Sequence, residues 1–167
     1  MGFYKLSILG EAAVGKTALI GRLTTNKFAR NYTLTVGTDV KTYTFKEVRY
    51  SLWDLGGQVK FDMMRGTFLR GSKIVFIVFD LSRPNIGRER IPYYKQVIEK
   101  NASPETIFIL YNKSDLLGKK QDVKGEIETT QQLLKKHFGK EFTHFVVSAK
   151  KGEGVLDPFE SLSTMFQ

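Results

Sequence analysis

The order of hydrophobic and polar positions divides the chain into short strands and longer helices. Six segments have the length and apolar content of strands: residues 3–9, 40–45, 48–53, 74–79, 106–111 and 142–147. The segments 74–79 (IVFIVF) and 106–111 (TIFILY) are apolar throughout, as expected for parallel strands covered on both faces. By contrast, the two segments between residues 40 and 53 alternate, which predicts a hairpin joined at Lys46 and Glu47.

Helical spacing of apolar residues appears between these strands. The stretches that show it are residues 17–23, 90–101, 123–138 and 155–166. An irregular helix is expected where the Gly-rich loop 54–66 ends, and residues 26–37 predict a long polar loop, a kind of loop that is often functional.

Strands therefore alternate with helices after one hairpin. This order predicts an α/β fold in which all 167 residues form one domain, residues 1–167. We expect a three-layer sandwich whose six-stranded sheet is mostly parallel, with one antiparallel strand and about five flanking helices. Ligands bind such a sheet at the carboxyl ends of its strands, so that edge is where functional residues are sought.

Composition limits the function classes only weakly. The chain is 41% hydrophobic and carries a net charge of +9. Its basic residues are dispersed and lack interleaved aromatic residues, so we interpret them as a solvated surface and consider nucleic-acid binding unlikely. There is no cysteine, and therefore neither a disulfide framework nor a residue for prenyl or palmitoyl attachment. No apolar run is long enough to cross a membrane.

The strongest motif lies directly after the first strand. Residues 10–17 (GEAAVGKT) match G-x-x-x-x-G-K-[ST], a loop whose backbone N–H groups surround phosphates at the start of a helix. Lys16 supplies a positive charge for the outer phosphates, and the Thr17 hydroxyl suits Mg²⁺. The alternative, a chance Gly-containing turn, is disfavoured because a strand precedes the motif and a helix follows it.

A second motif ends the hairpin. In residues 53–58 (WDLGGQ), Asp54 lies at a strand end, where a carboxylate can hold Mg²⁺ through water. The N–H of Gly57 can approach the last phosphate, and Gln58 can orient a water molecule for in-line attack. An Asp-x-x-Gly pattern is weak alone, and gains weight only because the phosphate loop accompanies it.

Two further motifs point to the base of a nucleotide. Residues 112–115 (NKSD) leave a buried strand, and Asp115 can accept two hydrogen bonds from the ring N–H and the amine of guanine. Adenine would leave that carboxylate unpaired, which is costly. Residues 148–150 (SAK) follow the last strand and can offer a backbone N–H to the guanine carbonyl. Taken alone, residues 112–115 would be interpreted as a polar loop and helix cap, and residues 148–150 give only a weak signal.

With these motifs in order along the whole chain, the sequence closely resembles the Ras superfamily of small GTPases, which have the P-loop NTPase fold. The resemblance implies a catalytic set of Gln58, Lys16, Thr35 and Gly57. It implies Mg²⁺ coordination by Thr17, Thr35 and Asp54. It also implies that GTP or GDP is held by Gly10, Ala12, Ala13, Val14, Gly15, Lys16, Thr17, Ala18, Phe28, Tyr32, Thr35, Gly57, Asn112, Lys113, Asp115, Leu116, Ser148, Ala149 and Lys150.

The subfamily features are mixed. Residues 10–23, 68–71 and 148–150 resemble the Rab branch, whereas WDLGGQ and the short hairpin resemble the Arf branch. The chain is therefore identified as Rab-like with an Arf-like switch II. Ala12 and Ala13 replace glycines of Ras itself. Val40 stands where Rab proteins usually have an effector-binding Phe, although Trp53 and Phe68 of this chain would complete a similar apolar patch.

These features predict a monomeric molecular switch that slowly hydrolyses GTP, in membrane trafficking or a related process. By the same resemblance it signals through switch I, which contains Thr35, and switch II, which contains Asp54, Gly57 and Gln58. The expected partners are an activating protein, an exchange factor and effectors. No arginine for the transition state is evident in the chain. We expect a cytoplasmic location, with peripheral membrane contact as a possibility. A non-hydrolysing GTP-binding scaffold is the alternative. A phosphate-loop metabolic kinase is disfavoured because it needs an arginine lid and a second substrate site.

Overall fold

A computed structural model describes residues 2–119 and 121–166. The sheet runs in the order β2-β3-β1-β4-β5-β6. Its strands are β1 (Phe3–Leu9), β2 (Thr38–Phe45), β3 (Val48–Leu55), β4 (Ile74–Asp80), β5 (Thr106–Asn112) and β6 (His144–Val146). Only the β2–β3 pair is antiparallel, and the other pairs are parallel. The six-stranded, mostly parallel sheet expected from the sequence is thus confirmed.

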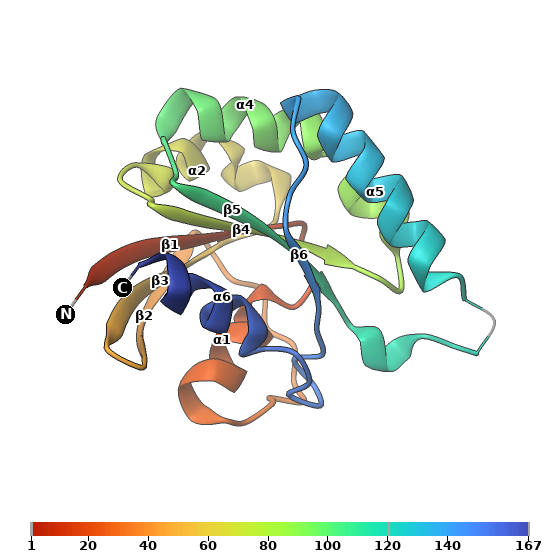
Figure 1. Ribbon diagram of the computed structural model, residues 1–167, viewed down its shortest axis with the longest axis horizontal. Helices are drawn as coiled ribbons and strands as arrows, with labels where there is room; N and C mark the ends of the chain where they lie inside the picture. The colour runs from red at the N-terminus through yellow and green to blue at the C-terminus, as the bar shows by residue number, and fades with distance from the viewer. Residues whose placement is uncertain (1, 120, 167) are drawn as a thin grey trace.

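Helices cover the two faces of this sheet (Figure 1). They are α1 (Lys16–Thr25), α2 (Asp62–Leu69), α3 (Pro84–Arg88), α4 (Ile91–Asn101), α5 (Val123–Phe138) and α6 (Asp157–Met165), with short 3₁₀ turns η1 (Val59–Phe61) and η2 (Ser114–Leu116). Helices α1 and α6 lie on one face, and α2, α4 and α5 on the other. The result is the three-layer sandwich that was predicted.

Each face has its own apolar core. On the α1 and α6 side, Phe159 packs edge-to-face on Tyr50 and Phe76, at centroid distances of 5.1 and 5.8 Å. On the other side, Tyr94 of α4 and Leu134 of α5 are fully buried against the central strands. All residues of β4 are buried, as its continuous apolar run predicted. The two cores fix the carboxyl ends of β1, β4 and β5 at one edge, where the motifs follow.

Two elements differ from expectation. Helix α3 was missed because it is only five residues long, too short for helical periodicity to show. It packs so closely that a Cβ on Gly87 would lie 2.5 Å from the Phe79 ring. Strand β6 is shorter than residues 142–147. Phe142 lies outside the strand because its carbonyl accepts a hydrogen bond from Gln131 Nε2 at 2.8 Å and its ring packs on Phe138.

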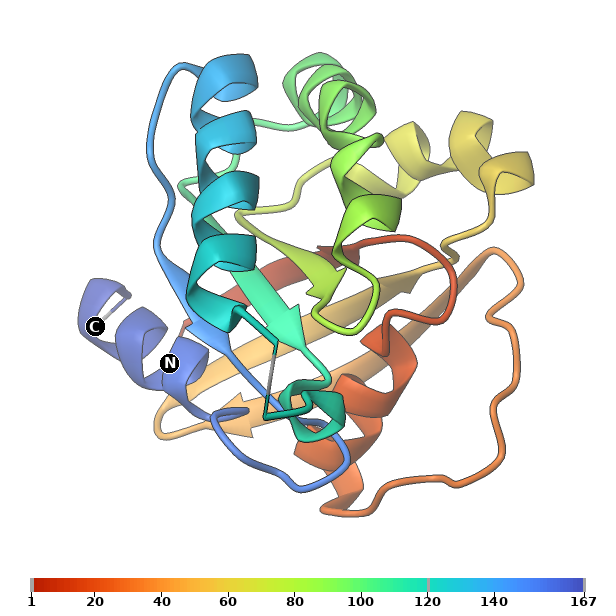
Figure 2. The same ribbon diagram turned by 90° about the vertical axis from the view of Figure 1, so that its right-hand side faces the viewer.

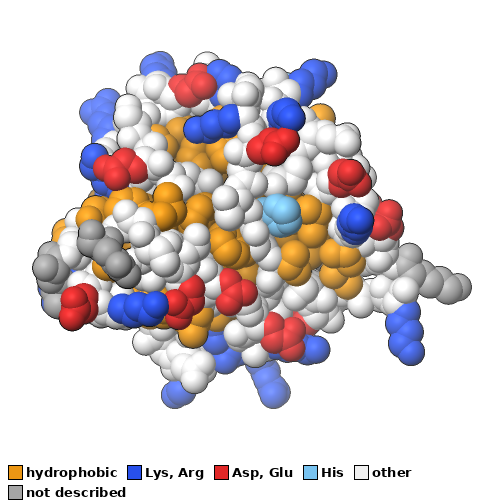
Figure 3. Space-filling view, viewed as in Figure 1, with side chains coloured by type: hydrophobic (Ala, Val, Ile, Leu, Met, Phe, Trp, Pro, Cys, Tyr) orange, Lys and Arg blue, Asp and Glu red, His pale blue; other side chains and the backbone are white. Residues whose placement is uncertain are grey.

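The two ends of the described chain lie together, away from the phosphate loop (Figure 1). The ring centroids of Tyr4 and Phe166 are 4.6 Å apart. On the face shown in Figure 3, basic side chains are spread around the outline with acidic ones among them. Among the described residues, no helix is long and apolar enough to cross a membrane.

Candidate active site

The phosphate loop takes a shape that its sequence makes possible. Gly15, which caps α1, has φ +100°, a conformation that residues with a side chain rarely adopt. A Cβ at this position would also lie 2.2 Å from Asn112 Nδ2. Ala13 has φ +64°, so the loop holds one non-glycine residue in the left-handed region. Such strain persists only where the surroundings hold it in place.

Side chains of other segments brace the loop carbonyls. Lys113 Nζ donates to Ala13 O at 2.6 Å, and Asn112 Nδ2 donates to Val14 O at 2.9 Å. The Asn112 Oδ1 accepts from Ala149 N at 3.1 Å. Asn112 therefore ties the phosphate loop to the loop that follows β6.

Lys16 is 5% exposed and folds back on its own loop. Its Nζ donates to Gly10 O at 2.9 Å and to Glu11 O at 2.7 Å. Burial lowers the pKa of Lys16 to about 8, although the charge of Asp54 opposes this shift. A polyanion beside Nζ would favour the charged form, so the lysine suits a phosphate ligand.

Three oxygen-bearing side chains gather beside Lys16. The Thr17 hydroxyl bonds Asp54 Oδ2 and lies 2.7 Å from Thr35 Oγ1, which itself donates to Asp54 Oδ2 at 3.3 Å. The other oxygen, Asp54 Oδ1, is buried and has no hydrogen-bond partner among the described residues. Burial raises the pKa of Asp54, against the lowering effect of the Thr17 hydrogen bond. One unpartnered carboxylate oxygen and two hydroxyls fit Mg²⁺, because this ion prefers oxygen ligands and is usually bound by a carboxylate together with the phosphates of the substrate.

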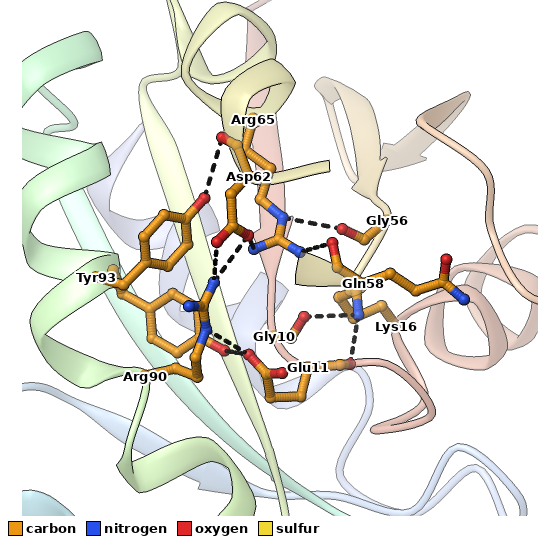
Figure 4. A network of polar contacts seen from close by, with 10 residues as sticks. Gly10, Glu11, Lys16, Gly56, Gln58, Asp62, Arg65, Arg90 and Tyr93 are labelled. Carbon is orange, nitrogen blue, oxygen red and sulfur yellow. Dashed lines mark hydrogen bonds and ion pairs between the residues drawn. The ribbon is translucent and has the colours of Figure 1, made fainter. Parts of the chain in front are cut away.

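Gly57 and Gln58 follow at the same edge. A Cβ on Gly57 would lie 2.3 Å from Ala12 N and 2.4 Å from Glu11 C, so only glycine fits against the phosphate loop. The Gln58 side chain is half-buried, and its amide points away from Arg65 in Figure 4. Thr35, Gly57 and Gln58 all line the same cavity as the phosphate loop, at the end where outer phosphates would be.

The opposite end of the site carries the motif for the base. Lys113 has φ +66° and also pairs with Asp80 at 2.9 Å. Burial alone would raise the pKa of Asp80, but hydrogen bonds from Ser82 and Lys113 hold that pKa below its ordinary value. Asp115 Oδ1 accepts from Ser148 Oγ at 2.7 Å, which fixes the carboxylate at the rim.

An arginine that the sequence analysis did not single out braces this end. Arg22 Nε donates to Ala149 O at 2.8 Å, its Nη1 to Asn26 O at 3.0 Å, and its Nη2 to Lys150 O. Arg22 thus joins the end of α1 to the loop after β6. Spacing gave no signal for it, because its two partners in the loop after β6 are 127 and 128 positions away.

One cavity of about 720 Å³ connects the two ends. The candidate residues on its wall are Ala12, Ala13, Gly15, Lys16, Thr17, Ala18, Phe28, Tyr32, Thr35, Gly57, Gln58, Asn112, Lys113, Asp115, Leu116, Ala149 and Lys150. Gly10, Val14, Asp54 and Ser148 are buried behind the wall. The cavity also adds residues that were not predicted, namely Gly21, Thr25, Lys27, Ala29, Arg30, Asn31, Thr33 and Leu34.

Arg30 bears on one expectation. The sequence analysis found no arginine for the transition state, yet Arg30 lies in the long loop and lines the cavity. Its side chain is exposed. Figure 2 shows this loop, after α1, running along the outside of the molecule. The length of the polar loop 26–37, which contains Arg30, is the only signal in the sequence that points to it.

A polar network lies directly behind switch II (Figure 4). Arg65 of α2 donates to Gly56 O, Gln58 O and the Asp62 carboxylate. Arg90, just before α4, pairs with both Asp62 and Glu11. None of these side chains was predicted, because Asp62, Arg65 and Arg90 belong to no motif and Glu11 occupies a variable position of the phosphate-loop motif.

Comparison with known proteins agrees with this geometry. The profile of the Ras family matches residues 5–167. Over 166 residues the chain is 34% identical to the Ras-related protein RabC of Dictyostelium discoideum, covering 95% of this chain and 81% of RabC. It is 37% identical over 122 residues to Rab-32B and 35% identical over 128 residues to Rab-32D of the same organism.

The alignments with the two Rab-32 proteins cover 68% and 71% of this chain, and 47% and 56% of those proteins. The chain therefore spans about half the length of these two relatives. The likeness of WDLGGQ to the Arf branch stays a prediction. The match along nearly the entire chain shows that it belongs to the Ras family and is a Rab-like small GTPase, a GTP-hydrolysing molecular switch.

Proposed function

We propose that the cavity holds GTP or GDP with the phosphates on residues 10–17 and guanine against Asp115. The observation that carries this proposal is the single cavity that joins the phosphate loop to the Asp115 end. Asp115, fixed by Ser148, would accept from the ring N–H and amine of guanine, whereas adenine would leave it unpaired. In this structure the Ala149 N–H donates to Asn112 Oδ1. This hydrogen bond would have to lengthen before the Ala149 N–H could donate to the guanine carbonyl.

Thr17, Thr35 and Asp54 would hold Mg²⁺. When bound, the ion neutralises charge on the phosphate oxygens. The hydrogen bonds that now join these three side chains would be replaced by contacts to the cation, and Asp54 Oδ1 would gain a partner. Thr35 comes from the open loop 27–37, so its contact depends on the position of that loop.

For hydrolysis, we propose that Gln58 orients a water molecule toward the terminal phosphorus. The water oxygen bonds to that phosphorus as the bond to the bridging oxygen breaks, which leaves GDP and inorganic phosphate. Lys16 and the Gly57 N–H would stabilise the charge on the transferred group. The donors of Arg65 are taken by Gly56 O, Gln58 O and Asp62, so Arg65 does not serve as the transition-state arginine.

Loss of the terminal phosphate would release Thr35 and Gly57, and with them both switches. Exposed apolar side chains lie on these segments, including Val36 (75% exposed) and Met63 (96% exposed), and they would form or lose a partner surface. Effectors, an exchange factor and an activating protein are the proposed partners. An arginine from the activator would raise the rate by about 10³–10⁵.

The Rab-related relatives support a role in membrane trafficking or a related regulatory process, for a monomer acting in the cytoplasm or peripherally at a membrane.

Single-turnover phosphate release from protein loaded with GTP and Mg²⁺ tests the enzymatic part. We expect slow release that Gln58→Leu suppresses by at least about tenfold, while GTP and GDP dissociation change little. Undiminished release from Gln58→Leu would refute the role of Gln58. Retained GTP with no release, even when an activating protein is added, would instead indicate the non-hydrolysing scaffold.

A further inference from the structure

Arg65 is the largest fully buried side chain described, at 2% exposure. Its Nε donates to Gly56 O at 2.9 Å and its Nη2 to Gln58 O at 2.8 Å. These two carbonyls flank Gly57, so one planar guanidinium fixes the backbone on both sides of that glycine. The third nitrogen, Nη1, donates to Asp62 Oδ1 at 2.6 Å. Every nitrogen of Arg65 is thus engaged with switch II.

The contacts continue from Asp62 to the phosphate loop. Arg90 Nη2 lies 2.8 Å from each oxygen of Asp62, and Arg90 Nε donates to Glu11 Oε1 at 3.1 Å. The Tyr94 hydroxyl also donates to Glu11 Oε1, at 3.0 Å. The guanidinium carbon of Arg90 lies 4.0 Å from the centroid of the Tyr93 ring, and this stacking holds the guanidinium in position.

These contacts form a closed circuit. Gly57 packs against the backbone of Glu11 and Ala12, where a Cβ would lie within 2.4 Å of Glu11 C. From Gly57 the circuit passes through Arg65, Asp62 and Arg90 and returns to the Glu11 carboxylate (Figure 4). Switch II is therefore joined to the phosphate loop twice, once through backbone packing and once through partly buried ion pairs.

We propose that Arg65, Asp62, Arg90 and Glu11, here called the relay, position Gly57 and Gln58 for hydrolysis without touching the nucleotide. Arg90 and Glu11 are positioning residues, because they act on Gln58 through Arg65. The inference rests on the proposed role of Gln58. It goes beyond that role because it locates the control of Gln58 in the residue that precedes α4 and in a phosphate-loop side chain that lies outside the cavity wall.

The composition of the relay explains why each member matters. Two guanidinium groups and two carboxylates share a poorly solvated space, with side-chain exposures of 2% to 24%. Removing one member leaves the charge of its partner unpaired in this space, which is costly. The remaining side chains would then move to find other partners, and the backbone around Gly57 would move with them. Lysine in place of Arg90 could contact Asp62 or Glu11 but would not bridge both as the planar fork does.

Arg90→Met tests the proposal, because Arg90 lines neither end of the nucleotide cavity. We expect single-turnover GTP hydrolysis to fall by roughly tenfold, since small displacements of a positioned group have effects of this size or larger. Dissociation rates of GTP and GDP should stay within about twofold. Arg88→Met is the matched control, because Arg88 pairs with Glu126 and Thr130 of α5, away from switch II; its hydrolysis should stay unchanged.

A double-mutant cycle separates positioning from general damage. If Arg90 acts through Gln58, Arg90→Met should lower the rate in the native background and have almost no further effect in Gln58→Leu. An equal fold-change in both backgrounds, or a loss confined to nucleotide affinity, would overturn the relay. If Gln58→Leu itself leaves hydrolysis unchanged, the proposed function fails first, and the two failures remain distinct.

Glu11→Gln is the second variant, used if Arg90→Met unfolds. It keeps the shape of the side chain and an acceptor for the Tyr94 hydroxyl while removing the charge that pairs with Arg90. We expect a smaller loss of about threefold in hydrolysis that Gln58→Leu again abolishes. A melting temperature within a few degrees of native, together with native hydrolysis, would refute the relay.

Discussion

The phosphate loop and the switch I loop, residues 27–37, lie on two sides of one cavity and are held in opposite ways. In the phosphate loop, carbonyls from Gly10 to Val14 accept from Lys16, Lys113 and Asn112. Among the described residues, hydrogen bonds of the switch I loop occur only near its two ends: Lys27 N donates to Thr25 Oγ1 at the start, and Thr35 and Gly37 are bonded at the finish. Residues 28–34 make no hydrogen bond within the described part of the chain.

The difference separates binding from signalling. A braced loop keeps its shape without a ligand, so nucleotide binding costs little ordering there. A loop fixed only at its ends can move as a unit when those contacts are lost, and elements of low local stability are the ones that switch. Thr35 provides one of the few contacts that hold the switch I loop near the site. Each prediction below disturbs one side of this comparison.

The largest effect is expected from Gly15→Ala, on the braced side. The new Cβ would displace Asn112 and require a strained φ, at a cost of about 1–3 kcal/mol for the backbone and about 1 kcal/mol for each lost hydrogen bond. We expect GDP affinity to fall by roughly 100-fold, measured by fluorescence titration.

Gly37→Ala is the matched control for that prediction. Gly37 also has a positive φ, +74°, but a Cβ there meets nothing within 4 Å. The substitution should cost about 1 kcal/mol of stability and change GDP affinity by less than about fivefold. If the two variants lose affinity equally, the braced and open loops do not differ in the way described.

An intermediate effect is expected from pH. In the nucleotide-free protein, the pKa of Lys16 is lowered from 10.5 to about 8. Above pH 8 the lysine is neutral and must take up a proton to pair with phosphate, so GDP affinity should fall by up to about tenfold between pH 8 and 9. Calorimetry in buffers of different ionisation enthalpy would detect the proton uptake; its absence would contradict the prediction.

The same shift affects stability with the opposite sign. The unfolded chain binds the Lys16 proton up to pH 10.5, whereas the folded protein releases it near pH 8. The free energy of unfolding of the nucleotide-free protein should therefore rise between pH 8 and 10.5, by up to about 3 kcal/mol. Lys16→Met should remove this rise in denaturant titrations.

The smallest effect on affinity is expected from Thr35→Ala, on the open side. The variant loses the contacts to Thr17 and Asp54, worth about 1 kcal/mol each at most. GDP affinity should change by less than about threefold, while amide exchange of residues 27–37 in the GTP-loaded protein should become as fast as in the GDP-loaded protein. Continued protection with GTP would show that another contact closes the switch I loop.

What could be predicted from the sequence follows the same division. The phosphate loop, the two base motifs and switch II depend on residues close in sequence, so their spacing is informative. The relay could not be predicted, because Arg90 meets Asp62 across 28 positions and Glu11 across 79. Arg22 was missed for the same reason. Helix α3 was missed because five residues carry too little periodicity.

The packing of Tyr4 on Phe166 has a practical consequence for anyone who wishes to handle the protein. Strand β1 separates residue 3 from the phosphate loop by about 20 Å, at roughly 3.3 Å per residue. Because the two rings touch, the other end of the described chain lies on that same remote side. A fluorophore, bead or surface linker attached next to Tyr4 or Phe166 would therefore lie on the side of the molecule away from the cavity, and both switches would stay open to solution.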